Sequence, residues 1–227
     1  MKIIAFGDIH MTTSTLAEIE EISSADLIIV SGDITNFGNR KDAKTVLGDI
    51  LSHNKNLLCL AGNMDNIEVN DYLSDLEINL HAQAHMVKRQ VCVYGVGGSN
   101  PTPFDTPWEL SENRLHQAIH EAHEQAKELI ELALPITGSP PPTIFVSHAP
   151  PHNTKVDRLK SGKHVGSRVI RKFIESTAPD LCVVSHIHES KGTDYIGPTP
   201  VVNPGMLADG GWIDIAITHQ KITYTLQ

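Results

Sequence analysis

Short apolar runs rich in β-branched residues recur along the chain, and they restrict the possible folds more than any other feature of the sequence. Each run is bounded by polar or turn residues and has the length of a buried strand. The runs cover residues 3–6, 27–30, 57–60, 91–96, 143–146, 181–184 and 200–202. Continuous apolar runs are typical of strands that are covered on both faces, as in α/β proteins. The sequence therefore predicts a sheet-based fold whose strands lie beneath other layers.

Amphipathic segments separate several of these runs and are predicted to be helices. Residues 15–22 and 42–51 have apolar residues at helical spacing. The longest helix is expected to begin at Thr106-Pro107-Trp108-Glu109, which has a capping-box pattern with proline at the first helical position, and to end at Leu134-Pro135. A further helix should start after Ser167. Alternating strands and helices indicate a mixed α/β class.

The C-terminal tail, residues 211–226, alternates apolar and polar residues and predicts a closing pair of antiparallel strands. Residues 140–142 are three prolines, which we interpret as a stiff surface link because strand-like sequence resumes directly after them. A chain of 227 residues can form one large core. We therefore expect a single domain over residues 1–227.

Charge and cysteine content limit the possible partners and compartments. A formal net charge of −9 argues against a broad basic surface, so we expect neither nucleic acid nor an anionic membrane as a partner. Cys59, Cys92 and Cys182 lie inside apolar runs, show no metal-binding or disulfide spacing, and are expected to be buried thiols. The apolar N-terminal run is too short for a signal peptide, and no run reaches membrane-spanning length. These features predict a soluble cytoplasmic protein.

Residues of the metal-ligand type follow five of the predicted strands. They form the motifs Asp8-Ile9-His10, Gly32-Asp33, Gly62-Asn63, Ser147-His148 and His186-Ile187-His188. The first and last motifs place two ligands on the same side of an extended segment, because side chains alternate with period two. Any one motif on its own is more often a turn or an ordinary histidine. Five such motifs in order at strand ends are different, because ligand sites of α/β sheets gather there. The series favours a site for Mn, Fe, Zn or Ni, which carboxylate and imidazole together suit.

The order of these motifs resembles the calcineurin-like metallophosphoesterases, in particular their small prokaryotic single-domain branch. The matching series is Asp8-x-His10, Gly32-Asp33-x-x-Asn36, Gly62-Asn63-x-Asp65, His148 and His186-x-His188, with Asn203-Pro204-Gly205 as an additional strand-end loop. The resemblance covers most of the chain. It implies an αββα sandwich of two mixed β-sheets flanked by helices, and hydrolysis of a phosphate ester.

The resemblance also implies a role for each ligand position. One metal ion would be held by Asp8, His10 and His188, a second by Asn63, His148 and His186, and the carboxylate of Asp33 would bridge the two. Two divalent cations about 3.5–4 Å apart share a water, lower its pKa and bind the phosphoryl oxygens. Manganese is the expected ion, and iron, zinc or nickel would also fit. The implied substrate is a small phosphate ester, and homo-oligomerisation remains open.

Met64 occupies a position where many members of this family have a histidine that can protonate the leaving oxygen. A thioether cannot donate a proton. The neighbouring Asp65 is the candidate catalytic residue, with two alternatives: it holds His148 in the correct tautomer, or it caps a turn. Without the imidazole, phenolates should leave more readily than alkoxides. We also expect a phosphodiesterase that prefers diesters to monoesters, because a diester brings only one negative charge to a site surrounded by acidic residues.

Two other functions are compatible with the same motifs. A protein-binding scaffold on this fold would have degraded ligand positions, whereas all of them are retained here, and a count of bound metal ions separates the two hypotheses. A manganese-dependent nuclease would share the motifs but generally brings further domains, and activity on single-stranded DNA would reveal it.

Weaker signals lie outside the ligand motifs. His116, His120 and His123 share one face of a predicted helix, where a solvated surface is favoured over a third metal site. Residues 97–104 and 152–167 are the candidate substrate loops. Within the second loop, Ser167 is expected to cap a helix, and a phosphate seat at that helix start is the alternative.

Overall fold

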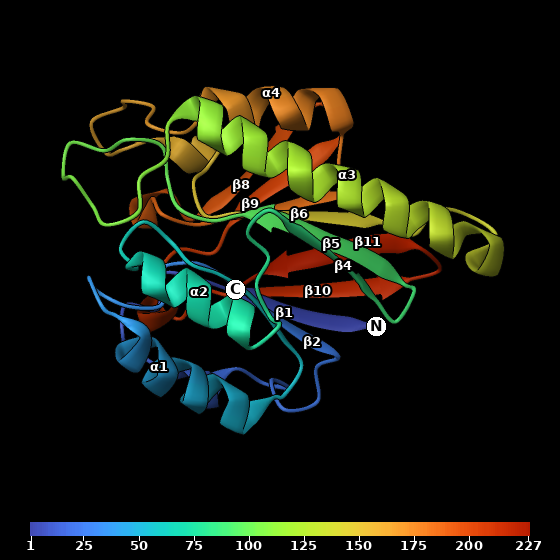
Figure 1. Ribbon diagram of the computed structural model, residues 1–227, viewed down its shortest axis with the longest axis horizontal. Coiled ribbons are helices and arrows are strands. Elements are labelled where there is room, and N and C mark those ends of the chain that lie inside the picture. Colours follow the sequence, from blue (N-terminus) through green and yellow to red (C-terminus); the bar gives the residue numbers. More distant parts are fainter.

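Two β-sheets face each other in the computed structural model, which describes residues 1–227 (Figure 1). The first sheet has the order β11-β10-β1-β2-β3. Its strands are β1 (Lys2–Phe6), β2 (Leu27–Ser31), β3 (Leu57–Leu60), β10 (Ile213–Thr218) and β11 (Lys221–Leu226). Strands β1, β2 and β3 are parallel, whereas β10 is antiparallel to β1 and β11 to β10. The predicted closing pair of strands is thus confirmed.

The second sheet has the order β4-β5-β6-β7-β9-β8. Its strands are β4 (Gln83–Val87), β5 (Val91–Val96), β6 (Thr143–Ser147), β7 (Leu181–Val184), β8 (Gly192–Ile196) and β9 (Thr199–Asn203). The central four are parallel, and the edge strands β4 and β8 are antiparallel to their neighbours. Both edge strands were missed from sequence because they are only partly buried and carry polar residues such as His85 and Asp194.

Helices cover the outer side of each sheet (Figure 1). Helices α1 (Arg40–His53) and α2 (Ile67–Asp75) lie on the side of the first sheet, and α3 (Glu112–Thr137) and α4 (Arg168–Thr177) on the side of the second. Short 3-10 helices η1 to η4 (Ser14–Glu18, Lys155–Asp157, His188–Ser190 and Leu207–Asp209) lie in the connecting loops. The predicted αββα sandwich of two mixed sheets is confirmed. No helix is both long enough and apolar enough to cross a membrane.

The continuous apolar runs are explained by packing on both faces of each strand. In β1, Ile3 and Ala5 belong to the core cluster between the sheets, whereas Ile4 and Phe6 pack in the cluster that includes the helices. All four side chains are fully buried. The predicted burial of the cysteines is also confirmed, and all three are free thiols.

The start of the longest helix differs from the prediction. Helix α3 begins at Glu112 with Ser111 as its N-cap, six residues after Thr106. One half of the predicted capping box forms, because the Glu109 carboxylate accepts hydrogen bonds from the backbone N–H and hydroxyl of Thr106 at 3.0 and 2.8 Å. It closes a loop instead of opening a helix. The other end also differs, since the helix continues through Pro135 to Thr137 and ends at the left-handed Gly138.

The predicted helix at residues 15–22 is only a short 3-10 helix, Ser14–Glu18, followed by a turn. Ile19 and Ile22, whose spacing suggested a helix face, are buried in that turn. The predicted helix at 42–51 is confirmed as α1, which starts with a capping box between Asn39 and Asp42.

Candidate metal centre

The predicted ligands converge at the carboxyl ends of β1, β2, β3, β6 and β7. All seven residues predicted as ligands lie in this one place, and the six His and Asp side chains form two overlapping groups that share Asp33. The groups are Asp8, His10, Asp33 and His188, and Asp33, His148 and His186. Within each group, one nitrogen or oxygen atom from every side chain lies within 4.8 Å of the others. The parallel strands thus bring together residues that are up to 180 positions apart in sequence.

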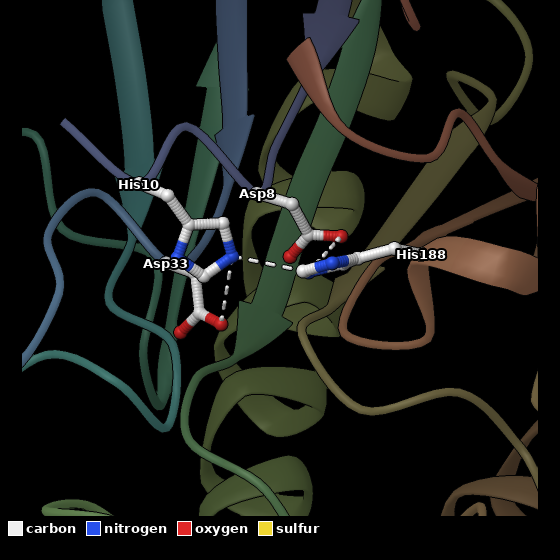
Figure 2. Close-up of side chains that lie close together, drawn as sticks. All are labelled: Asp8, His10, Asp33 and His188. Atoms are coloured by element: carbon white, nitrogen blue, oxygen red, sulfur yellow. Dashed lines mark hydrogen bonds and ion pairs between the residues drawn. The ribbon is translucent and has the colours of Figure 1, made fainter. Parts of the chain in front are cut away.

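The side chains of the first group point toward one another from the loops that follow β1, β2 and β7 (Figure 2). The Nε2 atoms of His10 and His188 are 3.0 Å apart. Oδ2 of Asp8 lies 3.6 Å from Nε2 of His188, and Oδ2 of Asp33 lies 3.7 Å from Nε2 of His10. Two ligands about 2.1 Å from one ion and at right angles to each other would be about 3.0 Å apart, which is the spacing of the two imidazoles. The donor set and its spacing fit a transition-metal ion.

A hydrogen bond fixes which nitrogen of His10 faces the group. Nδ1 of His10 lies 2.7 Å from the amide oxygen of Asn36, and the Asn36 amide also donates to the backbone carbonyl of His10 at 3.3 Å. Since an amide oxygen only accepts, Nδ1 carries the proton and Nε2 offers its lone pair. Asn36 belongs to the sequence motif, but its orienting role emerges only from the structure.

Hydrogen bonds also orient the side chains of the second group. Nδ1 of the fully buried His148 faces the carbonyl oxygen of Ser31 at 2.9 Å, so that Nε2 points to Oδ1 of Asn63 at 2.9 Å and Oδ1 of Asp33 at 3.4 Å. The amide nitrogen of Asn63 donates to the hydroxyl of Thr106 at 2.9 Å. This bond turns the Asn63 oxygen toward the group. The rings of His148 and His186 are 5.2 Å apart between centroids.

Asp33 is the link between the two groups. Its Oδ2 faces His10 and its Oδ1 faces His148, while the backbone N–H of Met64 donates to Oδ1 at 2.8 Å. The carboxylate is 2% exposed. One buried carboxylate therefore presents one oxygen to each group, as a bridging ligand must.

The backbone is left-handed at several of the candidate ligands. The φ angles are 48° at Asp8, 47° at His10, 50° at Asp33 and 72° at His186. Such angles cost free energy in non-glycine residues and gather at functional sites, where the surrounding structure holds them. The conformation turns the chain sharply after each strand and directs these side chains inward.

Asp33 and His148 polarise each other in the metal-free protein. Burial disfavours a charge on either group, but the attraction between them is larger. It lowers the pKa of Asp33 to about 2 and raises that of His148 to about 9. Burial, reinforced by the positive charge of His148, lowers the pKa of His186 to about 4. Near neutral pH the pair is therefore ionised, and His186 is an uncharged candidate ligand.

Asp65 is held by groups of the two loops that carry Asp33 and Asn63. Its fully buried carboxylate accepts hydrogen bonds from the backbone N–H groups of Ile34, Thr35 and Gly62 and from the Thr35 hydroxyl. It is absent from the lining of the cavity beside the ligands, and the expected contact with His148 is not formed. Burial and the neighbouring charge of Asp33 raise the pKa of Asp65 to about 6. The geometry corresponds to the turn-capping alternative: Asp65 ties the Asp33 loop to the Asn63 loop.

A cavity of about 950 Å³ opens beside the ligands. Both predicted substrate loops line it, through residues such as Asn100, Phe104, Lys163 and His164, and Met64 lies on its wall. In Figure 1 these loops project from the same end of the sandwich, beyond α3 and α4. The amide of Asn100 donates to the Val165 carbonyl at 3.1 Å and joins the two loops.

The start of α4 is already occupied by a carboxylate. Ser167 is its N-cap, as predicted, and accepts from the backbone N–H of Ile170. Glu112 accepts hydrogen bonds from the Ser167 hydroxyl and from the backbone N–H groups of Arg168 and Val169 at 2.7, 3.1 and 3.0 Å. The alternative of a phosphate seat at this helix start is therefore not supported.

The helix histidines lie away from the ligands. His116 and His120 are exposed, whereas His123 is half-buried against the rings of Tyr94 and Phe173. None of the three belongs to a group of potential metal ligands. The favoured solvated face is confirmed for His116 and His120 and is wrong for His123, which packs in the cleft between α3 and α4.

The fold agrees with the comparisons to known proteins. Residues 1–190 match the model of the calcineurin-like phosphoesterases, and the chain belongs to this family. It is 35% identical over 209 residues to an uncharacterised protein of Methanocaldococcus jannaschii, a match that covers 90% of this chain and 88% of that protein. The predicted family resemblance is thus confirmed.

Two solved structures illustrate how widely the fold is shared. The TT1561 protein of Thermus thermophilus superposes with a TM-score of 0.69 at 19% identity, over 99% of this chain and 98% of that one. A dimetal phosphatase of Danio rerio superposes with a TM-score of 0.63 at 8% identity, over 100% of this chain and 95% of the other. At these identities the likeness concerns the fold alone.

Proposed function

We propose that this protein is a dinuclear metal-dependent phosphoesterase. The observation that carries the proposal is the position of Asp33, whose two carboxylate oxygens face two separate groups of ligands. Asp8, His10 and His188 would hold one divalent cation and Asn63, His148 and His186 the other. Manganese is the expected ion, and iron, zinc or nickel would suit the same donors.

Neighbouring residues of the protein orient the candidate ligands. When bound, the two cations would supply an activated water and offset the charge of the phosphoryl group. Asn36 and Ser31 fix the tautomers of His10 and His148, and Thr106 turns the amide of Asn63. We propose that Asp65 acts only by positioning the two loops that carry Asp33 and Asn63.

A phosphodiester is the proposed substrate in preference to a monoester. The cavity of about 950 Å³ is large for one phosphate group and has room for the two organic groups of a diester. A diester also brings a single negative charge to a centre that contains the carboxylates of Asp8 and Asp33. We further propose that residues 1–227 form one domain, because β10 hydrogen-bonds to β1 although it lies beyond the family match.

Hydrolysis assays with controlled metal content test this function. The protein is stripped with a chelator, reloaded with Mn²⁺, and assayed with bis-p-nitrophenyl phosphate and with p-nitrophenyl phosphate. We expect activity only after reloading, with the larger kcat/KM for the diester. Activity that persists in the stripped protein would contradict the metal-dependent mechanism, and faster cleavage of the monoester would contradict the substrate preference.

A further inference from the structure

A histidine–aspartate pair lies in the wall of the cavity, outside the candidate metal ligands. Nδ1 of His164 is 2.6 Å from Oδ1 of Asp157. His164 lines the cavity and its side chain is 31% exposed, whereas Asp157 is fully buried. Asp157 also accepts hydrogen bonds from the backbone N–H groups of Asn153, Thr154 and Gly166. The carboxylate is thereby fixed, and it fixes the imidazole.

Burial would raise the pKa of Asp157, but these hydrogen bonds, led by that from His164, lower it. The group is therefore an anion that accepts the Nδ1 proton of His164. Because Nδ1 is committed to Asp157, the remaining nitrogen, Nε2, is the one that can exchange a proton with a ligand.

The loop that carries this pair is attached to the segments that carry metal ligands. On one side, Gly166 and Ser167 lie against residues 150–152, which follow the ligand His148 directly, and the N–H of Ser167 donates to the Pro150 carbonyl at 2.9 Å. On the other side, the N–H of Lys160 donates to the carboxylate of Glu189, next to the ligand His188, at 2.7 Å. The loop is thus tied to both segments, and His164 lines the same cavity as the candidate ligands His10, His186 and His188.

Met64 stands where the family motif often has a histidine that can donate a proton to the leaving oxygen. Met64 lines the same cavity but cannot donate a proton. Building on the phosphoesterase function proposed above, we infer that His164, oriented by Asp157, is the general acid that protonates the leaving oxygen. The protein would then cleave esters of poorly acidic alcohols, and the preference for phenolates suggested by Met64 would not hold.

The proposed reaction step exchanges a bond at phosphorus and transfers a proton from His164. An oxygen of water forms a bond to phosphorus while the bond from phosphorus to the ester oxygen breaks. The leaving oxygen keeps the bonding electrons and takes the Nε2 proton of the imidazolium, so that an alcohol is released. His164 becomes neutral and keeps its Nδ1 proton, which it donates in the hydrogen bond to Asp157. The attacking water releases a proton to solvent, and His164 takes up one proton from solvent.

The test compares leaving groups of different acidity in wild type and in His164→Asn, both loaded with Mn²⁺ to equal occupancy. The asparagine amide can still donate to Asp157, but it cannot deliver a proton. We expect at least a hundredfold loss of kcat/KM for a dialkyl phosphodiester, whose leaving group is an alkoxide, in line with general acid catalysis of 10²–10⁴-fold. Bis-p-nitrophenyl phosphate should lose less than about fivefold, because nitrophenolate leaves without a donor.

His152→Asn is the matched control, because His152 also lines the cavity and lies 3.7 Å from Asp157 but forms no hydrogen bond to it. The leaving-group dependence should not change in this variant. Equal losses for alkyl and aryl substrates in His164→Asn, or no loss at all, would overturn the proton-donor role. The phosphoesterase function itself would still stand if wild type bound two metal ions and cleaved the aryl diester.

Met64→His gives a second measurement that does not depend on the stability of a His164 variant. If His164 already protonates the leaving oxygen, a second imidazole should change the ratio of alkyl to aryl kcat/KM by less than about twofold. A rise of tenfold or more would show that wild type lacks a donor, which would contradict the inference.

Discussion

Gly62 lies so close to Asp33 that a β-carbon on Gly62 would stand 2.1 Å from Oδ1 of the Asp33 carboxylate. That distance is far below van der Waals contact, and Asp33 is buried and held by the backbone of Met64. Residue 62 must therefore be glycine if Asp33 is to keep one oxygen toward each group of ligands.

Gly62→Ala should accordingly displace Asp33 and weaken metal binding. We expect a loss of at least tenfold in kcat and in the affinity for Mn²⁺, measured by kinetics and by metal titration. Gly48→Ala is the control, because Gly48 is exposed in α1 and has no atom within 4 Å of an added β-carbon. This variant should gain up to about 1 kcal/mol in stability from helix propensity. Normal metal binding by Gly62→Ala would mean that the close contact does not constrain Asp33.

Asp33→Asn should abolish turnover and weaken the binding of both metal ions, because it removes the charge of the only carboxylate that faces both groups. The measurements are the metal content per chain after gel filtration and the initial rate with an aryl diester. Asp49→Asn, which changes an exposed carboxylate in α1, should affect neither quantity. If Asp33→Asn retained two metal ions and near-normal activity, the bridging assignment would be wrong.

Metal binding should release a proton from His148. Burial opposes a charge on this imidazole, but Asp33 and Asp8 outweigh it and raise the pKa of His148 to about 9. At pH 7 the metal-free ring is therefore protonated at both nitrogens, and an ion at Nε2 must displace one proton. Apparent affinity should rise with pH up to about 9. Calorimetric titration of Mn²⁺ in buffers of different ionisation enthalpy measures this release, and its absence at pH 7 would contradict the protonated state.

The helix histidines should be dispensable for the reaction. Alanine at His116, His120 or His123 should leave metal content and rate within about twofold, since surface changes remote from a site are usually mild. His123 differs in stability, because its Nδ1 is buried without a hydrogen-bond partner. His123→Leu should remove that cost and stabilise the protein by about 1 kcal/mol, or about 2–4 °C in Tm. Loss of a metal ion in any of these variants would show that the helix takes part in metal binding.

The parts of the fold that follow from local physical rules could be predicted from the sequence. Strands packed on both faces, such as β1 and β2, leave continuous apolar runs, and the ligands follow these strands directly. The partly buried edge strand β8 leaves no such pattern. The prediction also failed at Thr106 and Glu109, because the Glu109 carboxylate accepts from the Thr106 backbone N–H in a loop and no helix begins there.

The seven candidate ligands were identified because each follows a strand within a spaced motif. Their supporting contacts were not, since they depend on tertiary structure: Ser31 contributes only a backbone carbonyl to His148, and Asp65 is directed to backbone N–H groups of another loop. The pairing of His164 with Asp157 within a loop likewise has no periodic signal. Local sequence thus identified the candidate ligands but not the groups that orient them.

The central claim is that two metal ions lie on either side of Asp33. Crystals of the Mn²⁺-loaded protein, measured at the manganese absorption edge, would locate the ions directly by anomalous scattering. The account predicts two peaks about 3.5–4 Å apart, one beside His10 and His188 and the other beside His148 and His186, with Asp33 in contact with both. A single peak, or two peaks that do not share Asp33, would contradict it.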